Sequence, residues 1–477
     1  RNMIFSTYKF LFLFLPVTFC GYFLLNRFRY YSIAKIWLVL ASFYFYAQGS
    51  PDFFPFFLGS VVGNYAVGTC LTKMDGEQRA QRKFLLLLGI LANVGLLGYY
   101  KYTDFFIENF NLLTGSDYAL KHIVLPIGIS FFTFQLIAFL VDAYRGETKE
   151  YDIINYLLFI TFFPQLIVGP IIHHAEIVPQ FEDEKNLKLN PEHVAAGLFL
   201  FSIGCAKKIL LADPLTTDAQ AFFGNINDNL PMISSWYHSI EYTVSYYFDL
   251  SGYADMAIGL GMMFNIVIPH NFDSPYKARN FQDYWRRWHM TLSRFLSNYI
   301  FRSVYKKNCK WRNYYIATMV TFFVSGFWHG AGWTFVVWGL VNGFFVCTAS
   351  WMKRKGKKFP APIAYLLTAA GVVGARVLFV SNTFTDAWNV YRGMFNFNSL
   401  GSSVYEILRQ CWGFVKANGT CSILLVIGLF ICWFLPSSKH MQETFKPDVK
   451  RCVFAAVLLV ACIMQMNQVV QFLYFQF

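Results

Sequence analysis

Long apolar runs alternate with short polar segments along nearly the whole chain. A helix needs roughly 20 apolar residues to cross a bilayer, and several of the runs reach or approach that length. They cover residues 10–25, 36–47, 53–71, 84–100, 123–141, 154–172, 194–211, 240–268, 315–328, 334–351, 363–380, 422–435 and 453–473. The pattern predicts an all-α, polytopic integral membrane protein with about a dozen helices. The short runs 36–47 and 315–328 are candidates for re-entrant or interfacial helices.

The composition leads to the same class. Of the 477 residues, 56% are hydrophobic and only 14% are charged, whereas about a quarter of an average soluble domain is charged. The polar segments between the runs are loop-sized, so we expect one membrane domain over residues 1–477. The first run lacks a small-residue cleavage site and is followed at once by the next, which favours a retained helix over a signal peptide.

The formal net charge of +13 is explained by topology, and no nucleic-acid partner is expected. Basic residues gather in loops 26–35, 72–83 and 353–358, whereas loops 48–52 and 103–120 contain acids and no Lys or Arg. Because cytoplasmic loops carry the excess of basic residues, the three basic loops are predicted to be cytoplasmic and the N-terminus periplasmic.

One histidine lies within strongly apolar sequence, in TFFVSGFWHGAGWTF. An ionisable residue at bilayer depth is costly, so His329 is a candidate functional residue. A neutral imidazole can accept a proton from a hydroxyl or thiol. Gly326, Gly330 and Gly332 leave room for close helix packing or for a ligand. The alternative is a structural histidine bonded to a neighbouring carbonyl.

A second candidate lies in SPYKARNFQDYWRRWHMTLSR, residues 274–294. This segment is too charged to span and is rich in interfacial residues, which predicts a cytoplasmic-side interfacial helix. His289 follows Arg286, Arg287 and Trp288, and arginines in such a place can hold the phosphates of a nucleotide-bearing donor. The alternative is an anchor that contacts lipid headgroups.

The remaining polar residues in apolar sequence favour structural roles. Asp249, Ser251 and Asp255 share one predicted helix but point in different directions, which favours helix packing over an acid/base dyad. Gln135 and Asp142 are predicted to be buried and to need partners.

No metal site is predicted. His173 and His174 are adjacent in a predicted loop without a third ligand at metal spacing, so we expect them at the surface. The ten cysteines show no CxxC spacing. Cys411 and Cys421 flank a polar loop, where a disulfide is conceivable.

Five sequence blocks, in order, resemble the membrane-bound O-acyltransferase (MBOAT) family: LPIGISFFTFQ…DAYRG, FFPQLIVGPI, YFDLSGYADMAIGLG, NFDSPYKARNFQDYWRRWHMTLSRFL and FWHGAGWTFVVWGLVNG. The segment RVLFVSNTFTDAWNVYRGMF and the ending FLYFQF are similar to its bacterial polysaccharide O-acetyltransferase branch, of alginate and peptidoglycan type. The resemblance implies about 11 transmembrane helices, with re-entrant and interfacial pieces, around a central tunnel.

The resemblance also implies the chemistry. His329 would be the near-invariant membrane histidine and His289 the second, cytoplasmic-side histidine. An acyl thioester, most simply acetyl-CoA, would be the donor, with no tightly bound cofactor. A periplasmic SGNH-type partner would complete transfer to an exported polysaccharide from the bacterial inner membrane. We expect the donor-binding residues to be Lys277, Arg286, Arg287, Trp288 and Trp328.

The sequence departs from the family pattern after LSRFL. The family continues with Arg-Asp-Tyr and a Pro-Leu-Gly-Gly turn, whereas this chain reads SNYIFRSVYKKN. Asn298 replaces the acid and the turn is absent, so we expect a different local backbone with both histidines intact. Two alternatives remain: a D-alanyl or long-chain acyltransferase of the same family, and a transporter without covalent chemistry. Transporters often contain inverted repeats, and no internal repeat is found here.

Overall fold

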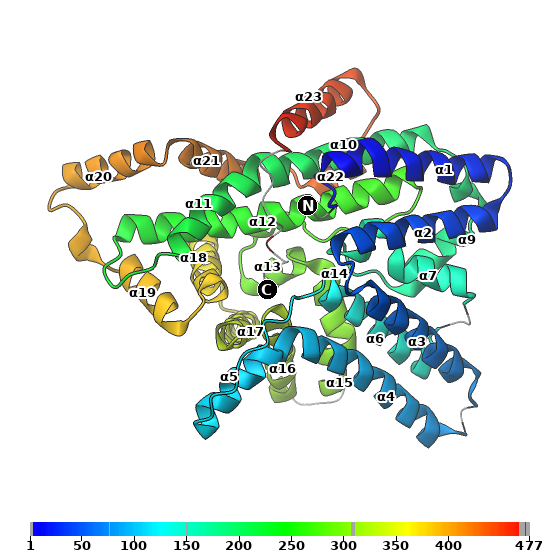
Figure 1. The fold of residues 1–477 in the computed structure, drawn as a ribbon. Helices are drawn as coiled ribbons and strands as arrows, with labels where there is room; N and C mark the ends of the chain where they lie inside the picture. The colour runs from blue at the N-terminus through cyan, green and yellow to red at the C-terminus, as the bar shows by residue number, and fades with distance from the viewer. Residues whose placement is uncertain (1–2, 76, 149–150, 307–310, 467–472, 474–477) are drawn as a thin grey trace.

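The computed structural model describes residues 3–75, 77–148, 151–306, 311–466 and 473, and every regular element within them is a helix (Figure 1). The first helices are α1 (Leu15–Arg27), α2 (Tyr31–Gly49), α3 (Phe54–Lys73), α4 (Arg79–Leu97), α5 (Thr103–Thr114), α6 (Ile129–Arg145), α7 (Ile153–Thr161), α8 (Phe163–Leu166) and α9 (His174–Glu182). The middle of the chain forms α10 (Pro191–Cys205), α11 (Asp213–Phe223), α12 (Met232–Met263), α13 (Phe281–Arg287), α14 (Met290–Leu296), α15 (Arg302–Val304) and α16 (Trp311–His329). The last helices are α17 (Trp333–Arg354), α18 (Ala361–Val380), α19 (Phe384–Met394), α20 (Val404–Ala417), α21 (Gly419–Phe434), α22 (Ser438–Glu443) and α23 (Val449–Gln465).

Among the described residues, six helical stretches are long and apolar enough to cross a membrane. They are Phe10–Arg27, Phe54–Lys73, Arg79–Thr114, Pro191–Phe223, Trp333–Arg354 and Ala361–Val380. The pair α20 and α21 passes the same test together but is bent by 101°. A multi-pass, all-α membrane protein is therefore confirmed, whereas the count of about 11 spans stays a prediction.

Two predicted spans have different boundaries because their backbones are interrupted. The run 154–172 is not one helix: α7 ends at Thr161, α8 has four residues, and the chain then continues without regular structure. Pro164 lacks the amide hydrogen that a continuous helix would need there. In the run 123–141 the helix begins only at Ile129, after Gly128 at φ +76°. Residues 467–472 of the last predicted span, and 474–477 of the FLYFQF ending, lie outside the described residues.

The segment 274–294 is not the single helix that its sequence predicts. This segment forms two short helices, α13 and α14, separated at Trp288 and His289. His289 adopts the left-handed conformation at φ 45°, which an α-helix cannot contain. Both side chains are buried, so the break places them in the protein interior.

Helix α12 lies at the centre of the fold, beside α10 and α11 (Figure 1). Close approach to α10 depends on glycine, because a Cβ on Gly204 would lie 2.6 Å from the main-chain oxygen of Gly252. Buried charges complete the contact and are paired, as buried charges must be. Lys207 lies 2.6 Å from Asp255, and Lys208 lies 2.5 Å from Asp249. This pairing agrees with the predicted helix-packing role of Asp249 and Asp255.

The same cluster receives a contact from far along the chain. The main-chain amide of Leu473 donates a 3.0 Å hydrogen bond to Oδ2 of Asp249, 224 residues earlier. Leu473 is itself buried. Leu473 therefore packs into the interior, against the central helix.

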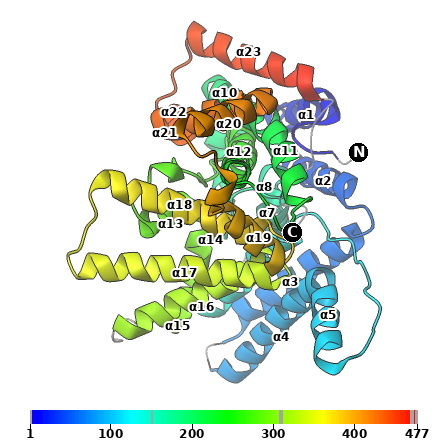
Figure 2. The ribbon, with the colours of Figure 1, turned by 90° about the vertical axis from the view of Figure 1, so that its left-hand side faces the viewer.

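Helices α16, α17 and α18 lie one against the next (Figure 2), and α16 carries two of the predicted site residues, Trp328 and His329. Glycine again sets the spacing, because a Cβ on Gly326 would lie 3.1 Å from Cα of Gly339 and closer still to the main-chain oxygen of Phe335. A Cβ on Gly330 would collide with the Phe335 ring. Both glycines therefore serve close packing between α16 and α17.

Candidate active site

The C-terminal end of α16 carries His329 into the protein interior. The side chain is 4% exposed. Its ring centre lies 4.9 Å from that of Trp328, 5.0 Å from that of Trp338 in α17 and 5.5 Å from that of Phe379 in α18. The imidazole is thus held among aromatic rings from three adjacent helices.

The last turn of α16 is fixed by two side chains of an earlier helix. Lys101 Nζ donates hydrogen bonds to the main-chain oxygens of Trp328 at 2.7 Å and His329 at 3.1 Å. The Tyr102 hydroxyl donates to the oxygen of Phe327 at 2.6 Å. The final carbonyls of a helix lack intrahelical partners, and a cation there interacts favourably with the helix dipole. Lys101 and Tyr102 therefore fix the backbone that carries His329.

Lys101 is not among the residues predicted from the sequence, although a signal for it is present. The residue directly follows the apolar run 84–100 and lies inside a 36-residue helical stretch, Arg79–Thr114. A lysine within such a stretch is costly unless it has partners, so it marks a functional or structural contact.

The second histidine lies in a strained loop that hydrogen bonds hold in place. His289 separates α13 from α14 at φ 45°, a conformation that costs a non-glycine residue about 1–2 kcal/mol. Asn271 stabilises the turn, because its main-chain oxygen accepts from Met290 N at 2.9 Å and its Oδ1 accepts from Thr291 Oγ1 at 3.0 Å. Burial lowers the pKa of His289 to about 3, so the imidazole is uncharged at neutral pH.

The structure brings the two candidate histidines together. Each imidazole lies within electrostatic range of the other. Phe131 of α6 lies close to His289 and to Trp328, the neighbour of His329. Its ring centre is 6.3 Å from that of His289 and 5.4 Å from that of Trp328. We call this pair, His289 and His329, the histidine pair.

A buried arginine beside the histidine pair is a further residue that the sequence did not predict. Arg376 of α18 is buried, and its guanidinium lies 4.2 Å from the ring centre of Tyr246, 5.0 Å from Phe379 and 5.2 Å from Trp288. A cation over aromatic faces is stabilised by the ring quadrupoles, more strongly when water is absent. Arg376 thus links the aromatic surroundings of His329, through Phe379, with those of His289, through Trp288.

The predicted donor-binding residues separate into two groups. Trp288 and Trp328 are buried beside the histidine pair, and Trp328 Nε1 donates to the oxygen of Ser130 at 3.3 Å. Lys277 and Arg287 are engaged elsewhere: Lys277 Nζ donates to Leu435 O at 2.7 Å, and Arg287 Nε pairs with Asp283 Oδ1 at 2.9 Å.

Arg286 is exposed and lines a cavity of about 320 Å³, called here the α13–α16 cavity. Trp285 and Ser325 also line it, and the Trp285 ring lies 5.9 Å from that of Trp338, which contacts His329. This cavity therefore approaches the histidine pair through two tryptophans.

A second cavity, of about 540 Å³, lies at the start of α6 and is called here the α6 cavity. Residues 49–53 and 123–131 supply most of its lining. Its members Ser130 and Phe131 contact Lys101, Trp328 and His289. The histidine pair thus has one cavity beside its α6 contacts and another beside its α13 and α16 contacts.

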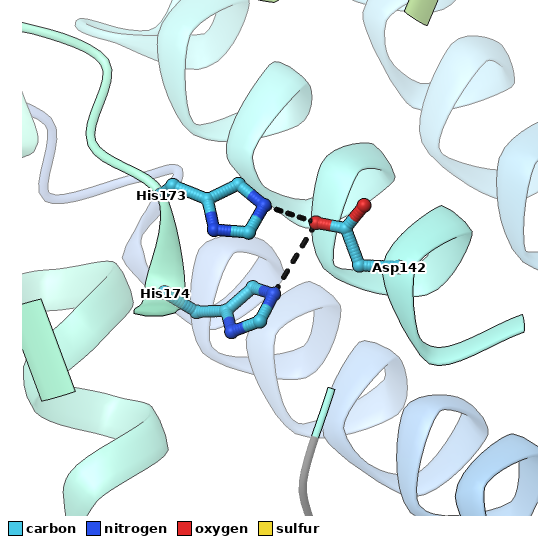
Figure 3. A group of neighbouring side chains, drawn as sticks. All are labelled: Asp142, His173 and His174. Atoms are coloured by element: carbon cyan, nitrogen blue, oxygen red, sulfur yellow. Dashed lines mark hydrogen bonds and ion pairs between the residues drawn. The ribbon is translucent and has the colours of Figure 1, made fainter. Parts of the chain in front are cut away.

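Two further expectations are corrected. His174 is 1% exposed and not at the surface, and Asp142, 32 residues earlier, contacts both His173 and His174 (Figure 3). No local spacing points to this third group, because it lies on another helix, α6. Cys411 and Cys421 are both free thiols, so the conceivable disulfide is absent between these two described residues.

The family model described as MBOAT, membrane-bound O-acyltransferase family, matches residues 54–378. The peptidoglycan O-acetyltransferase of Helicobacter pylori is 38% identical, covering 96% of this chain and 94% of that protein. A probable alginate O-acetylase of Pseudomonas aeruginosa is 34% identical, covering 83% of this chain and 76% of that one. The teichoic acid D-alanyltransferase of Bacillus subtilis is 28% identical over 49% of this chain and 61% of its own.

The matched region of the family model contains both members of the histidine pair, the buried Arg376 and the lining of the α13–α16 cavity. It also spans most of the helices that are long enough to cross a membrane. With a match over well over half of the chain, and relatives at this level of identity, the chain belongs to the membrane-bound O-acyltransferase family and is an acyltransferase.

Proposed function

We propose that this protein transfers acetyl groups from a cytoplasmic thioester, acetyl-CoA, across the bacterial inner membrane for O-acetylation of an exported cell-wall or surface polysaccharide. The observation that carries the proposal is the buried histidine pair, whose aromatic surroundings contact residues that line two separate cavities. Two cavities suit a reaction whose donor and acceptor arrive from opposite sides. The acetyl group would then move through protein, which avoids carrying a charged nucleotide across lipid.

The donor side is assigned to the α13–α16 cavity. Arg286 lines it, and guanidinium groups bind phosphates through charge-assisted hydrogen bonds. Helix α17 ends near the basic loop 353–358, which the positive-inside bias places in the cytoplasm. The α6 cavity is assigned to the acceptor side, because it is lined by the loop 48–52, which contains no basic residue. This topology places the N-terminus in the periplasm.

In the reaction, the hydroxyl oxygen of the acyl acceptor bonds to the carbonyl carbon of the thioester. The neutral imidazole of His329 accepts the proton of that hydroxyl. The tetrahedral intermediate then collapses, the carbon–sulfur bond breaks, and the protonated His329 gives its proton to the leaving sulfur, so that CoA leaves as the thiol and His329 is neutral again. His289 lies within electrostatic range of His329 and belongs to the same buried site. Lys101 and Tyr102 keep α16 in position throughout. A periplasmic SGNH-type protein would take the acetyl group on to the polymer.

Acetyl transfer is favoured over D-alanyl transfer by the relatives. The O-acetyltransferase of H. pylori matches 96% of the chain, whereas the D-alanyltransferase of B. subtilis matches about half of it. The peptidoglycan name belongs to a relative that covers more of the chain than the alginate O-acetylase of P. aeruginosa does, so peptidoglycan is the first acceptor to test.

The test uses the full chain in liposomes with acetyl-CoA that carries a labelled acetyl group on one side and soluble peptidoglycan fragments, as hydroxyl acceptor, on the other. We expect the wild type to release CoA and to deliver label to the other side, and His329→Ala to do neither while it still inserts and elutes as a folded protein. His440→Ala, at an exposed position, is the matched control and should retain full activity. A tenfold loss of activity corresponds to about 1.4 kcal/mol of lost transition-state stabilisation. If His329→Ala retains more than about a tenth of the wild-type activity, the catalytic role is refuted. Solute transport without CoA release would support a transporter instead.

A further inference from the structure

A cluster of metal-ligating side chains lies outside the histidine pair and its two cavities. Oδ2 of Asp142, near the end of α6, lies 2.6 Å from Nε2 of His173 and 3.2 Å from Nε2 of His174. Figure 3 shows both imidazoles directed at the same carboxylate oxygen. One ligand atom from each residue lies within 4.8 Å of the other two. Two imidazoles and a carboxylate therefore converge on one point.

The surroundings of the cluster orient these groups. The Tyr299 hydroxyl lies 2.9 Å from Oδ1 and 2.8 Å from Oδ2 of Asp142, so its hydrogen bond can pass to Oδ1 when a metal binds Oδ2. The Tyr151 hydroxyl lies 2.8 Å from Nδ1 of His174, the ring nitrogen that faces away from Asp142. Metal-ligating histidines and carboxylates are usually held in this way by hydrogen bonds to their other polar atoms.

We propose that Asp142, His173 and His174 bind a zinc ion that links α6 to the start of α9. Imidazole and carboxylate are both zinc ligands, and three protein ligands with one open position form a common zinc site. A cavity of about 30 Å³, lined by His173, His174, Asn298 and Tyr299, adjoins the cluster. That is enough room for a water molecule, which would be the fourth ligand. The side chain of His173 is 30% exposed and provides the entry path.

The protons balance without an additional reactant. In the metal-free protein, an imidazole whose hydrogen is on Nε2 donates it to Asp142. On zinc binding this hydrogen moves to Nδ1, which frees the Nε2 lone pair, and Nδ1–H of His174 then donates to the Tyr151 hydroxyl. Ligand atoms about 2.1 Å from zinc are about 3.4 Å apart in a tetrahedron, so His173 must move away from Asp142 by less than about 1 Å.

Zinc here would act through structure and not through acyl chemistry. Helix α9 also carries Glu176, which forms a two-bond ion pair with Arg294 of α14, at 2.5 and 2.9 Å. Helix α14 begins directly after His289. A metal that fixes α9 on α6 would therefore support the helix that follows one member of the histidine pair.

The experiment measures metal on the purified full chain in detergent. The protein is treated with a chelator, incubated with Zn²⁺, separated from free metal and analysed for zinc content. We expect about one zinc per chain for the wild type and for the exposed-site control His440→Ala, and less than about a tenth of that for His173→Ala. Zinc should also raise the midpoint of thermal unfolding of the wild type, and not of His173→Ala.

A second variant guards against loss of folding. Asp142→Asn keeps the shape of the side chain but weakens a zinc ligand, and should elute as the wild type does with reduced zinc. Co²⁺ in place of Zn²⁺ should give the visible absorption of a four-coordinate site in the wild type only. A wild type that retains no zinc, or zinc retained equally by wild type and His173→Ala, would overturn the proposal and leave a network of hydrogen bonds. None of these measurements depends on acetyl transfer.

Discussion

The ammonium of Lys101 lies 3.1 Å from the main-chain oxygen of His329, across 228 positions of sequence. The contact joins the helical stretch Arg79–Thr114 to the last residue of α16. Because the lysine bonds the backbone and not the imidazole, it fixes the position of His329 without occupying a ring nitrogen. Lys101 therefore positions the backbone of His329, while the imidazole ring remains available for proton transfer.

Removal of this contact should affect catalysis more than folding. We expect Lys101→Met to lower acetyl transfer at least tenfold, equivalent to about 1.4 kcal/mol, because two carbonyls at the end of α16 lose their donor. Tyr102→Phe, which removes only the bond to Phe327, is the matched control and should cost about 1 kcal/mol of stability with a smaller loss of activity. Turnover and thermal unfolding in detergent distinguish the two. Activity of Lys101→Met within about twofold of the wild type would contradict the assignment.

The two adjacent arginines should differ in their effect on donor binding. The sequence predicts one shared role for them, but Arg287 is paired with Asp283 whereas Arg286 is exposed on the α13–α16 cavity. A phosphate contact contributes mostly uniform binding, so Arg286→Ala should raise the donor KM about threefold to tenfold with little change in kcat. Arg287→Ala should raise it less. The reverse order in steady-state kinetics would argue that the donor displaces Asp283.

The close packing of α16 on α17 can be tested at glycine. We expect Gly326→Ala to destabilise the protein by about 1–3 kcal/mol, because the added methyl group meets the backbone of α17. Gly374→Ala in α18 is the matched control, since no atom lies within 4 Å of the position that its methyl group would occupy, and it should be neutral or stabilising. Chemical or thermal unfolding measures both. Equal stability of the two variants would indicate that the helices separate at little cost.

Topology can be tested at the basic loop 353–358. A cysteine replacing Lys355, on a background without native cysteines, should be labelled only after the cytoplasmic side is opened to a membrane-impermeant reagent. A cysteine replacing Asp117, in the loop 103–120, should be labelled from the periplasm. Periplasmic labelling at Lys355→Cys would reverse the assignment of donor and acceptor sides.

The membrane class and the principal helices were predictable from the sequence because apolar length is a local property. The runs that became α3, α17 and α18 were located within a few residues. The prediction failed where a break depends on backbone conformation, as at Pro164 and at His289, whose left-handed φ no periodicity indicates. An apolar run alone cannot distinguish a spanning helix from two short helices buried against neighbours.

The site was predicted in part for a related reason. His329 is conspicuous because one ionisable residue interrupts apolar sequence, and the same logic applied to Arg376 would have identified it. The contact partners of these histidines could not be predicted from the sequence. Lys101 contacts His329, and Asp142 contacts His173 and His174, only through tertiary packing. A single sequence contains no signal for which distant helices will be neighbours.

The hydrogen bond between Leu473 and Asp249 has a consequence for how the protein is made. When the ribosome has made Asp249 of α12, it has yet to synthesise Leu473, which lies 224 residues later. Lys208, which is synthesised earlier, is already available to neutralise the carboxylate. The order of synthesis thus places charge compensation first and the final hydrogen bond last. The hydrogen bonds of Asp249 are therefore complete only after the ribosome has synthesised Leu473.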